Sequence, residues 1–150
     1  MAKAFQFAFL LQLAEDKREE AARAISAAVL RLEQSKQQLL QIEQYRLEYR
    51  ARLADTASRG MRIHQWNDFH LFLAKLDSAV DQQVLDRERC EAQVEASKQA
   101  WLVCEKEVKA YEMLQARHNE RENQKEAKRE QKLSDEWASV SQRRRENPDN

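Results

Sequence analysis

The chain has 150 residues with 26 basic and 26 acidic side chains, and its formal net charge of zero gives no field that would gather nucleic acid or an acidic membrane. It contains one glycine, Gly60, and one proline, Pro148, which is too little turn chemistry for a sheet-rich fold of this length. Ala, Glu, Lys, Leu and Arg account for 81 residues, a share that predicts long helices in a coiled coil.

Residues 4–13 (AFQFAFLLQL) form the only stretch that could be taken for a targeting signal. A single basic residue, Lys3, precedes it, Gln6 and Gln12 interrupt the apolar run, and no small-residue cleavage site follows. A membrane-surface helix is the other interpretation, but the basic residues that flank such helices are missing. No window approaches the roughly 18 apolar residues of a membrane span. We therefore expect a chain that is cytoplasmic or at most peripheral to a membrane.

A heptad pattern predicts the first helix, near residues 5–56. The a positions are Leu11, Arg18, Ile25, Leu32, Leu39, Arg46 and Leu53, and the d positions are Ala14, Ala21, Ala28, Ser35, Ile42 and Tyr49. Only Arg18, Ser35 and Arg46 are polar. One face of this helix is therefore expected to pack against a partner helix.

The apolar pattern lapses over residues 54–62 and predicts a turn at about residues 57–62. Gly60 lies there, and glycine tolerates the positive φ angle that often ends a helix. A second register then predicts a helix over about residues 63–140. Its a positions are Trp66, Leu73, Val80, Arg87, Val94, Trp101 and Val108, and its d positions are Phe69, Leu76, Gln83, Cys90, Ser97, Cys104 and Tyr111.

Two long amphipathic helices joined by a short turn lie antiparallel. The sequence therefore predicts an all-α fold, a two-helix antiparallel coiled-coil hairpin that forms one domain over residues 1–150. The first helix reaches the second only to about residue 115, so the rest of the second helix should overhang without a partner. Residues 141–150 are expected to form a frayed tail.

The overhang carries two charged ridges at helical spacing. The basic ridge consists of Arg117, Arg121, Lys125, Lys128 and Lys132, and the acidic ridge consists of Glu122, Glu126 and Glu130. Segregated ridges predict a surface for docking a protein, and a solvated single helix is the alternative. The acidic ridge argues against nucleic acid as the ligand. Leu133, Trp137 and Val140 then form a short apolar stripe.

The sequence contains no pattern for catalysis, metal binding or a cofactor. One glycine cannot build a phosphate-binding loop, and neither a C-x-x-C pair nor an H-E-x-x-H motif is present. His64, His70 and His118 are scattered. Because two packed helices enclose no concave site, we expect a protein that is not an enzyme and has no catalytic, metal-binding or cofactor-binding residues.

Near the turn, the chain carries more apolar side chains than a seam between two helices can bury. Outside both registers lie Leu40, Tyr45, Leu47, Ile63, Leu71 and Phe72. An exposed patch with aromatic side chains is typical of a protein–protein contact. The alternative is that a third helix or self-association buries these residues.

Residues 38–83 resemble the flagellar export protein family FliJ. That family carries Q-x3-L-x2-Y-x3-Y-R at the end of its first helix, and then an aromatic restart with W followed by F-x3-L-x2-A-x3-H. The corresponding residues here are Gln38, Ile42, Tyr45, Tyr49, Arg50, Trp66, Phe72, Leu76, Ala79 and Gln83. Ile42 and Gln83 depart from the pattern. The resemblance spans the chain in length and plan, and its middle portion is the distinctive part.

The resemblance implies a coiled coil similar to the two long helices of the central-stalk γ subunit of rotary ATP synthase. It implies a monomeric component of the flagellar type III export apparatus at the cytoplasmic face of the inner membrane. The implied partners are the hexameric export ATPase FliI, the export-gate protein FlhA and flagellar export chaperones, which the protein recycles. The gate would bind Gln38, Ile42, Tyr45, Tyr49, Phe72, Leu76, Ala79 and Gln83. The ATPase would bind the open end, where the basic ridge is the candidate surface.

The heptad registers and the resemblance make different demands on some residues. The registers assign Ile42, Tyr49, Leu76 and Gln83 to the seam, whereas gate binding needs them accessible. We therefore expect Ile42, Tyr49 and Leu76 to be half-exposed. An injectisome stalk protein of the same plan and a self-associating structural coiled coil are the alternative functions. The tyrosine and tryptophan pattern favours the flagellar protein over the injectisome stalk.

Overall fold

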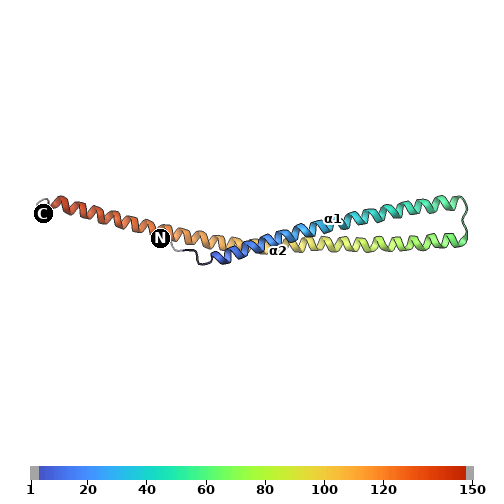
Figure 1. The fold of residues 1–150 in the computed structure, drawn as a ribbon, viewed down its shortest axis with the longest axis horizontal. Helices are drawn as coiled ribbons and strands as arrows, with labels where there is room; N and C mark the ends of the chain where they lie inside the picture. Colours follow the sequence, from blue (N-terminus) through green and yellow to red (C-terminus); the bar gives the residue numbers. More distant parts are fainter. Residues whose placement is uncertain (1–3, 148–150) are drawn as a thin grey trace. The chain divides into compact units, whose positions relative to one another are not determined.

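The computed structural model describes residues 4–147, and within that range all regular structure is helical. Helix α1 spans Ala8–Ser58 and helix α2 spans Ile63–Glu146 (Figure 1). The predicted all-α fold of two long helices packed against each other is confirmed. Lys3 and residues 148–150 of the predicted tail lie outside the described residues.

The helix ends differ from the ranges that the sequence pattern indicates. Helix α1 begins at Ala8 rather than near residue 5, and the Ala8 N–H donates to the Phe5 carbonyl at 3.2 Å. Helix α2 begins at Ile63, as expected, but it continues through residues 141–146, which were expected to fray. Arginines at positions 143–145 occupy its last turn, where positive charge stabilises the helix dipole.

The connection between the helices is short and uses the only glycine. Gly60 adopts φ 97°, the left-handed conformation that favours glycine. The Arg59 N–H donates to the Thr56 carbonyl at 3.2 Å, and the Gly60 N–H donates to the Ala57 carbonyl at 3.3 Å. These bonds satisfy carbonyl groups that the end of α1 leaves without helical partners. The turn thus lies where Gly60 predicts it.

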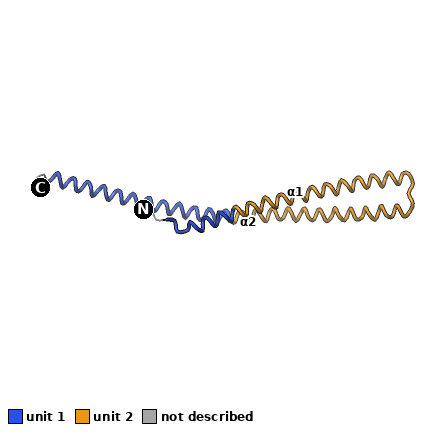
Figure 2. Tube along the Cα trace, viewed as in Figure 1, with its two compact units in different colours: residues 1–18, 104–150 blue, residues 19–103 orange. Residues whose placement is uncertain are grey.

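The chain divides into two compact units (Figure 2). We call residues 19–103 the hairpin unit. We call residues 4–18 together with residues 104–147 the terminal unit. Each unit contains parts of both helices.

The helices of the hairpin unit are antiparallel. Ser35 of α1 contacts Asp86 of α2, and Tyr49 farther along α1 contacts Phe72 earlier on α2. The predicted a and d positions of this unit are buried or half-buried on both helices, with one exception. Trp66 is exposed, and its ring lies 3.9 Å from the His70 ring one turn along α2 instead of entering the seam.

The seam of the hairpin unit is narrow and built largely from small side chains. Its buried residues are Ala28, Ser35, Leu39, Leu76, Val80, Val94 and Ser97. Small side chains let the helix backbones approach closely, so a thin stripe is enough to hold the two helices together. Most of each helix surface therefore stays open to solvent or to partners.

The three polar residues in the seam of α1 each have an acidic partner on α2. In the hairpin unit, Ser35 donates to Asp86 at 2.7 Å and Arg46 donates to Asp77 at 3.3 Å. In the terminal unit, Arg18 donates to Glu105 at 2.9 Å, and this hydrogen bond raises the pKa of the Arg18 guanidinium. A slip of either helix would separate these pairs, so they help to fix the register.

The terminal unit has its own small core. Leu11 and Ala14 of α1 pack against Val108 of α2, whose side chain is fully buried, and Tyr111 covers the cluster. All four are predicted seam positions. The heptad pattern therefore accounts for packing in both units.

Candidate partner-binding surfaces

Four aromatic rings from both helices form a cluster in the hairpin unit, which we call the aromatic patch: Tyr45, Tyr49, Phe69 and Phe72. The Tyr49 ring centroid lies 4.7 Å from that of Phe72 and 5.3 Å from that of Phe69. Tyr45 meets Phe72 edge-on at 6.3 Å. These separations are typical of favourable aromatic pairs. The tyrosines of α1 thus interlock with the phenylalanines of α2.

The aromatic patch has an inner and an outer pair. Tyr49 and Phe69 are half-buried in the seam, whereas Tyr45 is 45% exposed and Phe72 is 37% exposed. Burial raises the pKa of the Tyr49 hydroxyl, and the neighbouring Tyr45 adds to this shift. Tyr49 contacts both outer rings, and Phe69 contacts Tyr49. The patch therefore presents two large, preorganised apolar groups to solvent.

More apolar surface surrounds the patch. The other residues predicted to exceed the needs of the seam are also exposed: Leu40, Leu47, Ile63 and Leu71. A shallow groove lined by Leu40, Gln44 and Tyr45 lies on α1. Within residues 4–147 there is no third helix that could cover these side chains, so that alternative is removed for the described chain.

The two stripes that the resemblance assigns to gate binding lie side by side. At one level the Gln83 amide donates to the Gln38 side-chain oxygen at 3.2 Å, and at another Tyr45 and Tyr49 meet Phe72. The predicted residues Ile42, Leu76 and Ala79 lie on the same stripes between these levels. The structure therefore brings the eight residues onto adjoining strips of α1 and α2.

Accessibility differs among these eight residues. Ile42 and Tyr49 are half-buried, as expected, and Ala79 is also half-buried. The expectation for Leu76 is wrong, because this side chain is only 9% exposed. Leu76 occupies a d position on the face of α2 that meets α1, so the seam covers it. A partner on this surface would touch Tyr45 and Phe72 before Leu76.

Gln83 takes part in an internal hydrogen-bond network. Its amide group donates to the Ser35 hydroxyl at 3.1 Å and to the Ser35 carbonyl at 3.2 Å, and it lies 3.4 Å from an Asp86 carboxylate oxygen. The network ties α2 to α1 through a buried serine. This glutamine, which stands where the family has histidine, is thus a residue of the seam as well as of the predicted stripe.

Sequence reasoning did not single out Asp77 and Asp86, which anchor the polar contacts of the hairpin unit. Asp77 accepts from Arg46 at 3.3 Å and from Arg50 at 3.2 Å. The sequence signal that could have identified these two aspartates is the set of polar residues at seam positions of α1. An antiparallel register places an acidic residue of α2 opposite each of them.

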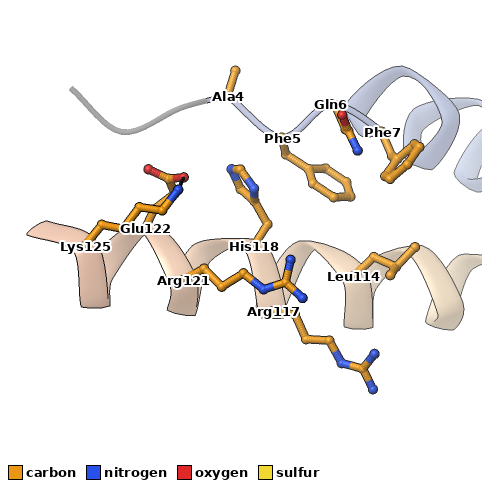
Figure 3. A pocket seen from close by; sticks show the side chains of 10 residues that line it. All are labelled: Ala4, Phe5, Gln6, Phe7, Leu114, Arg117, His118, Arg121, Glu122 and Lys125. Carbon is orange, nitrogen blue, oxygen red and sulfur yellow. Dashed lines mark ion pairs between the residues drawn. The ribbon is translucent and has the colours of Figure 1, made fainter.

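A second candidate surface lies in the terminal unit, where the segment before α1 covers part of α2. Phe5 lies 5.8 Å from Phe7 and 5.7 Å from His118, measured between ring centroids. Figure 3 shows the two phenylalanines above α2, with His118 pointing toward them. Together with Leu114 and Arg121 they line a groove of about 260 Å³. The expectation that α2 has no partner beyond residue 115 is therefore wrong for residues 115–125.

The basic ridge divides at this groove. Arg121 and Lys125 line it, and Arg117 borders it while its guanidinium points away from the N-terminal segment (Figure 3). Lys125 pairs with Glu122 at 3.6 Å. Lys128 and Lys132 are exposed farther along α2. In the acidic ridge, the Glu122 side chain is only 12% exposed, whereas Glu126 and Glu130 are exposed.

Among residues 4–147 no group of three or more His, Cys, Asp or Glu side chains is placed to hold a metal ion. In the same range neither helix has a stretch apolar and long enough to cross a lipid bilayer.

Comparison with known proteins identifies relatives. A family model described as "Flagellar FliJ protein" matches residues 3–147. The chain is 28% identical over 138 residues to the flagellar FliJ protein of Escherichia coli (strain K12). The aligned residues make up 92% of this chain and 94% of that protein. The chain is 26% identical over 129 residues to the flagellar FliJ protein of Salmonella typhi, covering 86% and 88% respectively. No solved structure matches the chain.

Proposed function

The chain belongs to the flagellar FliJ family, and from this premise we propose that it is a non-enzymatic component of the flagellar protein-export apparatus. It binds the export gate FlhA through the aromatic patch and the export ATPase FliI through the basic ridge of the terminal unit. It acts at the cytoplasmic face of the inner membrane, where it promotes export and returns emptied export chaperones to use.

The aromatic patch is the observation that carries this proposal. Tyr45 and Phe72 are exposed, and the half-buried Tyr49 contacts both of their rings. Aromatic side chains are enriched among the residues that dominate binding energy. Rings that are already ordered lose little conformational entropy when a partner covers them. The patch therefore has the properties of a protein-binding site.

The proposed mechanism is a difference in binding affinity. A protein that binds one state of the gate more tightly than the other shifts the gate toward that state, by no more than the difference in binding free energy. Binding the ATPase through a separate unit raises the local concentration of the protein near the gate. No chemical step on this chain is needed.

The first test measures binding to the purified cytoplasmic part of the gate. We expect Tyr45→Ala/Phe72→Ala to weaken binding by about 2 kcal/mol, or roughly 30-fold in Kd, because it removes both outer rings. The matched control is Leu30→Ala/Leu85→Ala, which removes two exposed apolar side chains of the hairpin unit outside the patch. Titration calorimetry gives the Kd, and circular dichroism checks helix content. Equal affinity of both double variants would contradict the assignment.

A second test addresses the ATPase. Lys128→Glu/Lys132→Glu reverses two exposed charges on the basic ridge, and we expect it to weaken binding of the purified ATPase about tenfold at low salt. Lys36→Glu/Lys98→Glu makes the same charge change at exposed positions of the hairpin unit. If the two variants lose affinity equally, the effect is one of net charge and the basic ridge is not the ATPase site.

A further inference from the structure

The last turns of α2 carry an apolar face that neither proposed site uses. Leu133, Trp137 and Val140 are exposed, Trp137 to 71%. They follow one another at spacings of four and three residues, and Glu130 and Arg144 extend the same spacing at the two ends. We call these five residues the C-terminal stripe. Leu133, Trp137, Val140 and Arg144 also line a shared shallow groove.

The C-terminal stripe does not continue the seam of α2. Beyond Tyr111 the seam register passes through Gln115, His118 and Glu122, which are polar, and then through Lys125. The stripe is displaced from that register by one residue, which rotates it by about 100° around the helix. All of residues 123–147 are exposed. The stripe is thus a separate heptad face without a partner in the described chain.

We infer that the C-terminal stripe binds the same stripe of a second copy of this chain in an antiparallel pair. If Trp137 is at position a, then Glu136 and Arg143 are the flanking g positions, and the small residues Ser134 and Ser141 are the e positions. In an antiparallel pair with Trp137 opposite Val140 of the second copy, Glu136 lies opposite Arg143 of that copy. The twofold symmetry repeats this ion pair on the other side of the contact.

Other arrangements of two copies bring like charges together. A parallel pair places Glu130 against Glu130 and Arg144 against Arg144 in the contact. An antiparallel pair shifted so that Trp137 meets Leu133 places Glu136 against Glu136. Like-charge contacts disfavour both arrangements. The charge pattern therefore favours the antiparallel pair with Trp137 opposite Val140 over these two arrangements.

The contact is small, so the association is expected to be weak and reversible. Each copy contributes three apolar side chains from about two helical turns, which is below the size of a stable protein interface. It leaves Tyr45 and Phe72 uncovered in both copies, because it uses residues of the terminal unit only. This distinguishes it from self-association through the aromatic patch.

The test uses complementary charge reversal in the full-length chain, with sedimentation velocity up to about 1 mM protein. We expect the wild type to dimerise with increasing concentration. Glu136→Arg and Arg143→Glu should each weaken dimerisation at least about tenfold, because each turns both ion pairs into repulsive pairs. An equimolar mixture of the two variants should dimerise again, because each variant then supplies the charges that the other lacks.

Asp135→Arg is the matched control, because it makes the same charge change one residue away at an exposed position that faces away from the contact. It should dimerise like the wild type, and Trp137→Ala should not dimerise. The inference is overturned if the wild type stays monomeric, if mixing the two charge variants restores nothing, or if Tyr45→Ala/Phe72→Ala abolishes the association instead.

Discussion

The seam of the hairpin unit and residues 123–146 of α2 have similar helix-forming sequences but opposite surroundings. In the hairpin unit, α1 buries Leu76, Val80 and Val94 of α2. In residues 123–146 every side chain is exposed, including Trp137. The difference lies in the partner, because helix propensity alone gives little stability in water without an apolar face packed on another element.

This comparison shows how the chain separates folding from binding. In the seam, apolar residues keep one register over several heptads, and the polar seam residues of α1 have acidic partners on α2. Outside the seam, Tyr45, Phe72 and the apolar residues of the C-terminal stripe are exposed. Surfaces of this second kind are the ones expected to bind other chains.

The largest expected effect comes from placing a charge in the seam. Val108→Asp should lower the free energy of unfolding by about 3 kcal/mol, because it buries an unpaired carboxylate against Leu11 and Ala14. Val103→Asp is the control, since that valine is exposed, and it should change stability by less than about 0.5 kcal/mol. Urea unfolding followed by circular dichroism measures both. Similar losses in the two variants would contradict the seam described here.

A smaller effect on the free energy of unfolding is expected from the hydrogen-bond network of Gln83 in the hairpin unit. Gln83→Ala removes the amide that donates to Ser35 and Gln38, and it should cost about 1 kcal/mol of unfolding free energy. The control is Gln99→Ala, which removes an exposed amide that bonds only within its own helix, to Glu95. The same unfolding experiment applies. If Gln83→Ala is as stable as Gln99→Ala, the network adds nothing to the fold.

Much of the fold follows from the sequence because the heptad pattern is regular. Burial confirms both registers except at Trp66, and Gly60 lies in the turn. The exposure of Leu40 and Leu71 was also predictable, since both residues lie outside the registers. Such predictions depend on the period of the helix and on antiparallel geometry, which short stretches of sequence determine.

The remaining features depend on contacts that no local pattern encodes. Phe5 precedes α1 and contacts His118 of α2, which is far away in sequence. Trp66 occupies a seam position but is exposed, and its ring lies against that of His70 one turn along α2. Leu76 satisfies both a seam pattern and a family pattern, and only the packed helices show that the seam covers it.

The central claim is that the gate binds the hairpin unit at the aromatic patch and not the terminal unit. Hydrogen–deuterium exchange of the full chain, with and without the purified cytoplasmic part of the gate, tests it most directly. The account predicts slower exchange of residues 42–49 and 69–76 when the gate is present, and unchanged exchange of residues 126–146. Protection confined to residues 126–146, with none around Tyr45 and Phe72, would contradict it.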